Sequence, residues 1–265
     1  MYTLYKISKM YTLDPDTYSS IVQLLPIDTI NDLRLTASSN SHQLSTLRNS
    51  NNFWKLRLEK FLNIQITFNP APETWHQVYT KITSGDLDLS QKLITFAQTG
   101  DFLVVGLLLE AGVDITADNN FALRAASANG HLQIVQVLLE AGADPTTEDN
   151  EALRAASSNG HLQIVQVLLT AGADVTADDN FALRAASSNG YFQVVQLLIQ
   201  AGADVTADNN EAMSYASANG HLQVVRLLLK AGADVTADNN SAIRAAFDNG
   251  YSQIVRLLRE AGATL

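Results

Sequence analysis

The side chains best suited to chemistry are histidines, arginines and acids that recur at fixed intervals along the chain. His131, His161 and His221 fall in one series with a spacing of 30 residues or its double. A second series holds arginine at four positions and is interrupted by Ser214: Arg124, Arg154, Arg184 and Arg244. A third series is acidic: Asp118, Glu148, Asp149, Asp178, Asp179, Asp208 and Asp238. Such residues could bind a metal ion or a charged peptide.

A metal site is not expected from the histidines. On consecutive packed helices they would stand roughly 10 Å apart. Zinc requires its ligands within about 2.0–2.3 Å of a single centre. His131, His161 and His221 are therefore assigned a structural role, and we expect no metal and no cofactor.

The arginine and acidic series allow two interpretations. In the functional one, they form a ladder of mixed charge that selects a charged peptide. In the structural one, they link adjacent repeats, with each exposed pair contributing at most about 1 kcal/mol. We favour the structural interpretation and keep the functional one open.

Motifs for catalysis are missing from the sequence. There is no glycine-rich phosphate loop, no H-E-x-x-H and no G-x-S-x-G. The chain has no cysteine, which excludes disulfides and thiolate chemistry. His42 and His76 stand outside any recognisable constellation. We therefore expect no catalytic residues and no enzymatic activity.

The elements that carry these series form a repeat of 30 residues. The segment 129–144, NGHLQIVQVLLEAGAD, recurs with few changes at 159–174, 189–204 and 219–234, and in divergent form at 99–114 and 249–264. The sequence predicts a turn at 118–120 with Asn120 as helix N-cap, a helix over 121–128 and a second helix over about 132–141. Gly130 and Gly142 are expected to end the helices in the left-handed conformation.

These residues resemble the ankyrin repeat, in a short form. The core is present at Gly130–His131, Ile134–Val135, Leu138–Leu139 and Gly142–Asp144, whereas F-A-L-R-A-A at 121–126 replaces the usual T-P-L-H-x-A. Three residues are missing relative to the usual 33, so we expect a shortened hairpin between repeats. The resemblance implies an all-α solenoid of six repeats over 83–265. Such short units are similar to those of giant-virus and intracellular-bacterial ankyrin proteins.

Recognition positions are expected where the repeats differ from one another. By the resemblance to ankyrin proteins, these positions line or border the concave face that usually binds a partner protein. Phe121 and Phe181 could anchor a partner, although packing on the neighbouring repeat is the favoured interpretation. The predicted target-binding residues are Phe121, Arg124, Glu151, Arg154, Phe181, Arg184, Glu211, Ser214, Tyr215 and Asp248.

Residues 1–82 are predicted to form a small helical domain. The order of apolar residues and prolines, ending in Phe53–Trp54, resembles the F-box motif, with its opening proline displaced to L-D-P-D. That resemblance implies binding to the Skp-type linker subunit of a cullin–RING ubiquitin ligase. The residues implied are Leu13, Pro15, Ile21, Leu25, Pro26, Ile30 and Leu33. The alternative is a helical cap that only shields the repeats.

Composition narrows the setting in which the protein works. Residues 81–265 hold the whole acidic excess behind the net charge of −10, so nucleic acid is not an expected partner. No apolar run spans a membrane, and the N-terminus has no signal-peptide core, although translation could start at Met1 or Met10. We expect a cytoplasmic monomer or, for an effector, a protein that reaches the host cytosol without a signal peptide. Two functions remain: a ubiquitin-ligase adaptor for an unidentified target protein, and a plain ankyrin scaffold or decoy.

Overall fold

The computed structural model describes residues 51–63 and 75–265. The chain divides into two compact units, Met1–Leu87 with Glu110–Gly112, and Asp88–Leu109 with Val113–Leu265. Every residue of the predicted Skp-type surface lies outside the described residues, and the F-box resemblance therefore stays a prediction: Leu13, Pro15, Ile21, Leu25, Pro26, Ile30 and Leu33.

The described part of the first unit consists of two helices, α5 (Asn51–Leu62) and α6 (Trp75–Thr83), which pack against each other. Their buried apolar side chains are Leu58, Leu62, Trp75, Val78, Tyr79 and Ile82. The Arg57 guanidinium carbon lies 5.8 Å from the Tyr79 ring centroid. Trp75 is fully buried and is a central residue of this small core.

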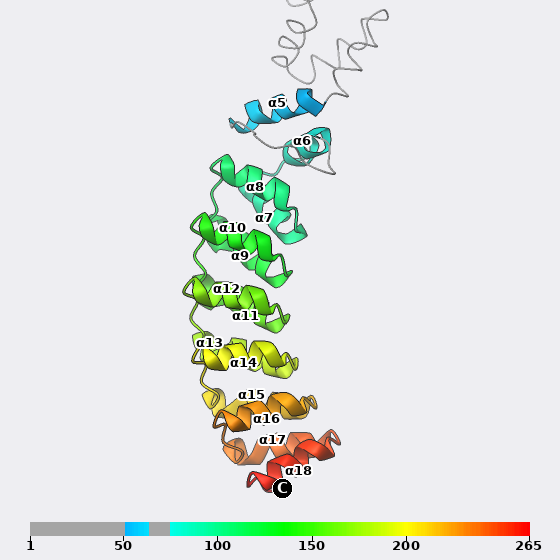
Figure 1. Ribbon diagram of the computed structural model, residues 1–265, viewed down its shortest axis with the longest axis vertical. Coiled ribbons are helices and arrows are strands. Elements are labelled where there is room, and N and C mark those ends of the chain that lie inside the picture. The colour runs from blue at the N-terminus through cyan, green and yellow to red at the C-terminus, as the bar shows by residue number, and fades with distance from the viewer. Residues whose placement is uncertain (1–50, 64–74) are drawn as a thin grey trace, which may run out of the picture. The chain divides into compact units, whose positions relative to one another are not determined.

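The second unit is a stack of helix pairs (Figure 1). Its helices are α7 (Leu89–Thr99), α8 (Phe102–Glu110), α9 (Ala117–Ala128), α10 (Leu132–Glu140), α11 (Thr147–Ser158), α12 (Leu162–Thr170), α13 (Ala177–Ser188), α14 (Phe192–Gln200), α15 (Ala207–Ala218), α16 (Leu222–Lys230), α17 (Ala237–Asp248) and α18 (Ser252–Glu260). The all-helical solenoid predicted from the sequence is confirmed for this part of the chain. No helix among the described residues is long and apolar enough to cross a bilayer.

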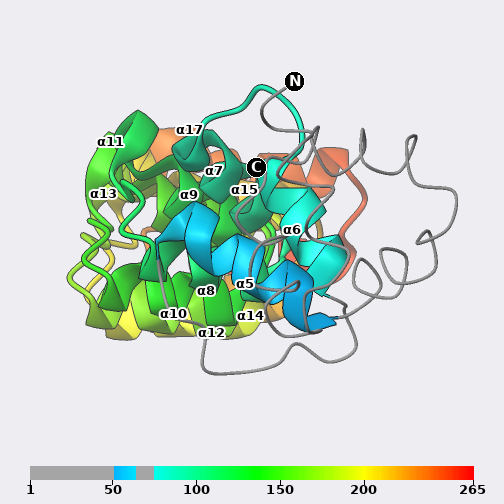
Figure 2. The same cartoon turned by 90° about the horizontal axis from the view of Figure 1, so that it is seen from above.

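The helices form two layers (Figure 2). The odd-numbered helices from α7 to α17 contact one another along the stack, and the even-numbered helices from α10 to α18 form the second layer. The first layer packs closely because Ala122 and Ala126, like their equivalents, are small and buried. In the second layer each helix buries one apolar stripe, as Ile134, Val135 and Leu138 do in α10. Neither layer could bury its apolar face in a single repeat.

Glycines end the helices where the sequence predicts. Gly130, after α9, has φ of 81°, and Gly142, after α10, has φ of 97°. Only glycine adopts this left-handed conformation without a steric cost. The fixed spacing of these glycines therefore sets the length of each helix, which in turn places the arginines and acids of successive repeats in register.

Candidate functional site

A left-handed turn opens the first helix of each inner repeat. Asp118, Asn119 and Asn120 have φ of 52°, 54° and 59°, and the same conformation recurs at 148–150, 178–180, 208–210 and 238–240. This conformation costs roughly 1–2 kcal/mol per residue for L-amino acids and is best tolerated by Asn and Asp. The turn stands where the sequence suggested a shortened hairpin, and the described residues contain no strand.

The last residue of this turn links the start of a helix pair to the loop that follows the same pair. The side-chain oxygen of Asn120 accepts a hydrogen bond from the Asp144 backbone N–H at 3.0 Å, and Asn150 accepts from the Asp174 N–H at 2.7 Å. Asn180, Asn210 and Asn240 make the equivalent bond to the backbone N–H of Asp204, Asp234 and Thr264. The predicted N-cap role of Asn120 is therefore wrong, because its side-chain oxygen binds an amide of the loop after α10 rather than one of its own helix.

An arginine closes the same turn from inside the repeat. Arg124 Nη2 donates to the Asp118 carbonyl at 2.9 Å, and Arg154 Nη2 donates to the Glu148 carbonyl at 3.1 Å. Arg184 and Arg244 make the same bond in their repeats. Each arginine thus satisfies a backbone carbonyl that the left-handed turn leaves outside the helix.

The other guanidinium nitrogen reaches across to the next repeat. Arg124 pairs with Glu151, and Arg184 pairs with Glu211 and, at 2.9 Å, with Asp208. Arg154 faces a phenylalanine at the position of those glutamates and instead pairs with Asp178 at 2.6 Å. These links match the structural interpretation of the charged series. Because the pairs are partly exposed, each is worth about 0.2–1 kcal/mol.

Phenylalanines fill the remaining places in this arrangement. The Arg124 guanidinium carbon lies 4.8 Å from the Phe121 ring centroid. The Phe181 ring lies between Arg154 and Arg184, at 5.3 Å and 5.6 Å. Both rings are half-buried rather than freely exposed. We call the resulting column the arginine ladder: Phe121, Arg124, Glu151, Arg154, Phe181, Arg184 and Glu211.

The ladder stops at Ser214. In place of an ion pair, the hydroxyl oxygens of Ser214 and Ser241 lie 2.6 Å apart in a hydrogen bond. Next to it stands Tyr215, whose equivalents in the neighbouring repeats are all alanine. Tyr215 is 40% exposed, and its hydroxyl donates to the Glu211 carboxylate. The array therefore presents one exposed aromatic side chain where its internal pattern breaks.

The carboxylates beside Tyr215 influence one another. The negative charge of Glu211 raises the pKa of Asp208 above its ordinary value. Burial raises the pKa of Glu211, but hydrogen bonds from Tyr215 and Arg184 outweigh that effect, and the net pKa is lowered. The hydrogen bond to Glu211 raises the pKa of the Tyr215 hydroxyl. Near neutral pH this end of the ladder is an anionic group beside an aromatic ring.

The other conspicuous residues lie apart from this surface. Asp248 is the last residue of α17 and is exposed, at the opposite end of that helix from Ser241. The three histidines support the stack, since the rings of His131, His161 and His221 lie over glycines of the preceding repeat. The sequence offered a signal for the asparagine links that was missed: Asn stays constant at 120, 150, 180, 210 and 240 while its neighbours vary.

Comparison with known protein families identifies the repeats of the array. Models of ankyrin repeats in three copies match residues 147–209 and 182–265, and a model of ankyrin repeats in many copies matches residues 122–169. A search of curated proteins gave no match. The matched ranges coincide with the helix pairs, the helix-ending glycines and the G-H…I-V…L-L…G-A-D core described above. The chain therefore belongs to the ankyrin-repeat proteins, whose repeats form a protein–protein interaction module.

Proposed function

We propose that this chain captures a partner protein on the surface around Tyr215, at the point where the arginine ladder ends. The observation that carries the proposal is the replacement of a small residue by a large exposed aromatic one. Ala125, Ala155, Ala185 and Ala245 occupy the equivalent positions. Tyrosine is enriched among the residues that dominate the energy of protein interfaces.

The chemistry around Tyr215 defines the partner. Glu211 and Asp208 provide negative charge, and the tyrosine ring provides a face that attracts cations. A lysine or arginine of the partner, placed on the ring and beside these carboxylates, satisfies both. The side chains of the arginine ladder that precede Tyr215 are already paired with one another. The ladder contributes to the proposed site by holding Glu211 through Arg184.

The experiment is proximity labelling with the full chain and with Tyr215→Ala. This substitution restores the residue found in the other repeats, so the fold is expected to persist. A true partner should be lost from the labelled set in Y215A and retained in Arg244→Gln, which alters a charge at the end of the array. An unchanged set of labelled proteins in Y215A would reject the proposal.

The finer function that we infer is that of an adaptor for a ubiquitin ligase of the Skp–cullin–F-box type. Its support is the order Leu13, Ile21, Leu25–Pro26, Ile30 and Leu33. In that case residues 12–60 recruit the linker subunit and the ankyrin array presents the captured protein. The alternative is a scaffold or decoy whose N-terminal segment is only a cap.

A pull-down with an Skp-type subunit separates these two functions. We expect the wild-type chain to bind it, Leu25→Ala/Pro26→Ala to lose binding, and the loop variant Ser39→Ala to keep it. Binding retained in the double variant, or absent from the wild type, would leave the scaffold as the better description. Neither result bears on the proposed capture of a partner at Tyr215, because the Tyr215→Ala experiment follows a different partner protein.

A further inference from the structure

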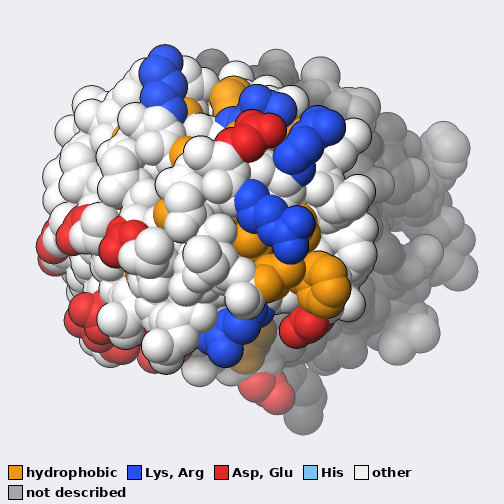
Figure 3. Space-filling view, turned by 90° about the horizontal axis from the view of Figure 1, so that it is seen from below, with side chains coloured by type: hydrophobic (Ala, Val, Ile, Leu, Met, Phe, Trp, Pro, Cys, Tyr) orange, Lys and Arg blue, Asp and Glu red, His pale blue; other side chains and the backbone are white. Residues whose placement is uncertain are grey.

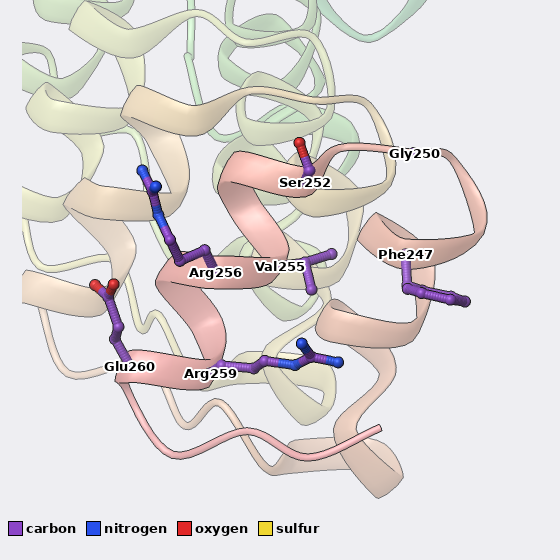
Figure 4. Close-up of a pocket in the computed structure, with 7 residues that line it drawn as sticks. All are labelled: Phe247, Gly250, Ser252, Val255, Arg256, Arg259 and Glu260. Carbon is purple, nitrogen blue, oxygen red and sulfur yellow. The ribbon is translucent and has the colours of Figure 1, made fainter.

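The C-terminal end of the array carries a hollow of about 540 Å³ (Figure 4). It lies between α17 and α18, on the last repeat. Gly250, in the turn that joins the two helices, forms one edge, and Val255 is the most buried residue of the lining. The full lining is Phe247, Gly250, Ser252, Val255, Arg256, Arg259 and Glu260.

Inside the array, the glycine equivalent to Gly250 always supports an aromatic ring. A Cβ on Gly190 would lie 2.5 Å from the His221 ring, and one on Gly220 would lie 2.5 Å from the Tyr251 ring. Gly100, Gly130 and Gly160 support His131, His161 and Tyr191 in the same way. Gly250 has no atom within 4 Å of that position. The end of the array thus offers an open surface of the shape that accepts a flat ring elsewhere in the chain.

A hydrogen-bond acceptor accompanies the three histidines among these rings. His161 Nε2 lies 3.1 Å from the Ala128 carbonyl, and His221 Nε2 lies 2.9 Å from the Ser188 carbonyl. The equivalent carbonyl at the end of the array belongs to Asp248. A ring that carries an N–H or O–H therefore suits Gly250 better than a purely apolar ring.

The end face differs from the inner faces in ways that disfavour another repeat of the same kind. Phe247 replaces a serine that is fully buried at 127, 157, 187 and 217, and its side chain is 58% exposed. A neighbour packed as in the inner repeats would have no space for this ring. Arg259 stands where the inner repeats have leucine or isoleucine, and Ser252 where they have leucine or phenylalanine.

Charge gathers at the same end. Figure 3 shows Lys and Arg side chains beside an apolar patch on this face. Arg259 extends from α18 toward α17 in Figure 4. Arg256, which also lines the hollow, points from the same helix to the side away from α17. Arg226 and Lys230 follow on α16, which packs against α18. Two arginines and one glutamate line the hollow, so its charge favours a ligand that places negative charge near Arg259 and Arg256.

We propose that this hollow is a second docking site, for an acidic segment of a partner protein that carries a tryptophan or tyrosine. The aromatic side chain lies on Gly250 against Phe247, and its N–H or O–H donates to the Asp248 carbonyl. Acidic side chains next to it in the segment pair with Arg259 and Arg256. The site is independent of Tyr215, which attracts a cationic partner.

The test uses fluorescence anisotropy with the full chain and three labelled nonapeptides. One has a central tryptophan between glutamates, the second replaces the tryptophan by alanine, and the third replaces the glutamates by lysines. We expect the tryptophan–glutamate peptide to bind and the other two to bind at least about tenfold more weakly, since each lost anchor removes on the order of 1–2 kcal/mol.

Matched variants locate the site. Phe247→Ser/Ser252→Leu/Arg259→Leu gives the end face the residues of the inner repeats, and binding should fall by at least about tenfold. Arg256→Gln/Arg259→Gln alters only exposed charge and should give the same loss of binding. This double variant tests the site even if the triple variant is too unstable to measure. Tyr215→Ala, outside the hollow, restores the alanine of the other repeats and should bind normally.

Three results would overturn the proposal. One is no binding of the tryptophan–glutamate peptide to the wild-type chain. Another is equal binding of that peptide to R256Q/R259Q and to the wild type. The third is a concentration-dependent dimer in sedimentation that R259Q abolishes, because the face would then be covered by a second copy of the chain.

Discussion

Asn150, at the start of α11, and Asp174, in the loop after α12, are joined by one short hydrogen bond, in which the Asn150 side-chain oxygen accepts from the Asp174 backbone N–H at 2.7 Å. Asn150 is only 6% exposed and has a left-handed backbone, with φ of 60°. One residue therefore satisfies two demands: it tolerates the conformation, and its side chain offsets part of the cost by binding the loop after the second helix of its own pair. The repetition of this link makes the turns part of the stack rather than surface connections.

Removing this side chain should destabilise the array. We expect Asn150→Ala to lower the free energy of unfolding by about 1–3 kcal/mol, because the Asp174 N–H loses its partner in a part-buried position and alanine tolerates the left-handed backbone poorly. Urea unfolding followed by circular dichroism measures the change. The control is Asp149→Asn in the same turn, since asparagine occupies the equivalent positions 119, 209 and 239. Equal stability of N150A and the wild type would contradict the role given to the link.

The break in the ladder can be repaired with residues that the chain uses elsewhere. Ser214→Arg/Ser241→Glu recreates the pairs Arg124–Glu151 and Arg184–Glu211. We expect the double variant to gain up to about 1 kcal/mol in unfolding free energy at low salt and less at high salt.

Each single variant provides the control for this repair. Ser214→Arg alone lacks the glutamate across the repeat boundary, and Ser241→Glu alone lacks the arginine. A gain in S214R equal to that of the double variant would show that the pair is not the cause. The same variants should also weaken the proposed capture of a partner at Tyr215, because they change the charge beside it.

Acid should loosen the array through the turns between repeats. The Thr176 hydroxyl and backbone N–H both donate to Asp174, and these hydrogen bonds lower its pKa below the ordinary value of 3.8. A lowered folded-state pKa contributes stability that is fully present above the unfolded-state value and is lost as pH falls through the folded-state value. Asp114, Asp144, Asp204 and Asp234 show the same shift for the same reason.

The expected result is a fall in unfolding free energy that begins near pH 4 and steepens below it. Asp208 acts in the opposite direction, because its pKa is raised by Glu211 and its protonation favours the folded chain. Urea unfolding at a series of pH values measures the sum. Thr176→Val removes one of the two hydrogen bonds to Asp174 and should make the acid loss shallower. An identical pH profile in T176V would argue against the Asp–Thr turns as its origin.

Sequence reasoning reached the helices but not the turns between them. Glycine at 130 and 142, alanine at 122 and 126 and the apolar stripe of α10 each have one physical explanation, and the structure confirms the helices they predict. The segment Asp118–Asn120 predicts a turn of some kind, yet its composition does not reveal that three consecutive residues are left-handed. That conformation depends in part on a distant partner, the Asp144 backbone N–H that binds Asn120, which the sequence of the turn does not contain.

The pairing of repeats was closer to being readable from the sequence. Residues 27 positions apart match in type across the boundary: Arg124 with Glu151, Arg184 with Glu211, and Ser214 with Ser241. A comparison of each repeat with the next, rather than of one equivalent position in all repeats, would have revealed this pairing across the boundary. The target-binding residues and the division at residue 82 stay predictions, as does the Skp-type surface. Binding depends on a partner molecule, and chemical type alone does not identify that partner.

Two glycines of one repeat separate steric contact from backbone strain. Gly160 has φ of 74° and Gly172 has φ of 99°, so an alanine at either position is strained. Only at Gly160 does the added Cβ meet another group, since it would lie 2.8 Å from the Tyr191 ring, whereas Gly172 has nothing within 4 Å. The ring belongs to the next repeat and is held by its own packing.

Gly160→Ala should therefore destabilise more than Gly172→Ala, by roughly 1–3 kcal/mol for the added crowding. Urea unfolding of the two variants gives the difference directly, and Gly160→Ala/Tyr191→Ala should remove most of it. Equal losses in G160A and G172A would mean that the ring of one repeat does not rest on the glycine of the repeat before it.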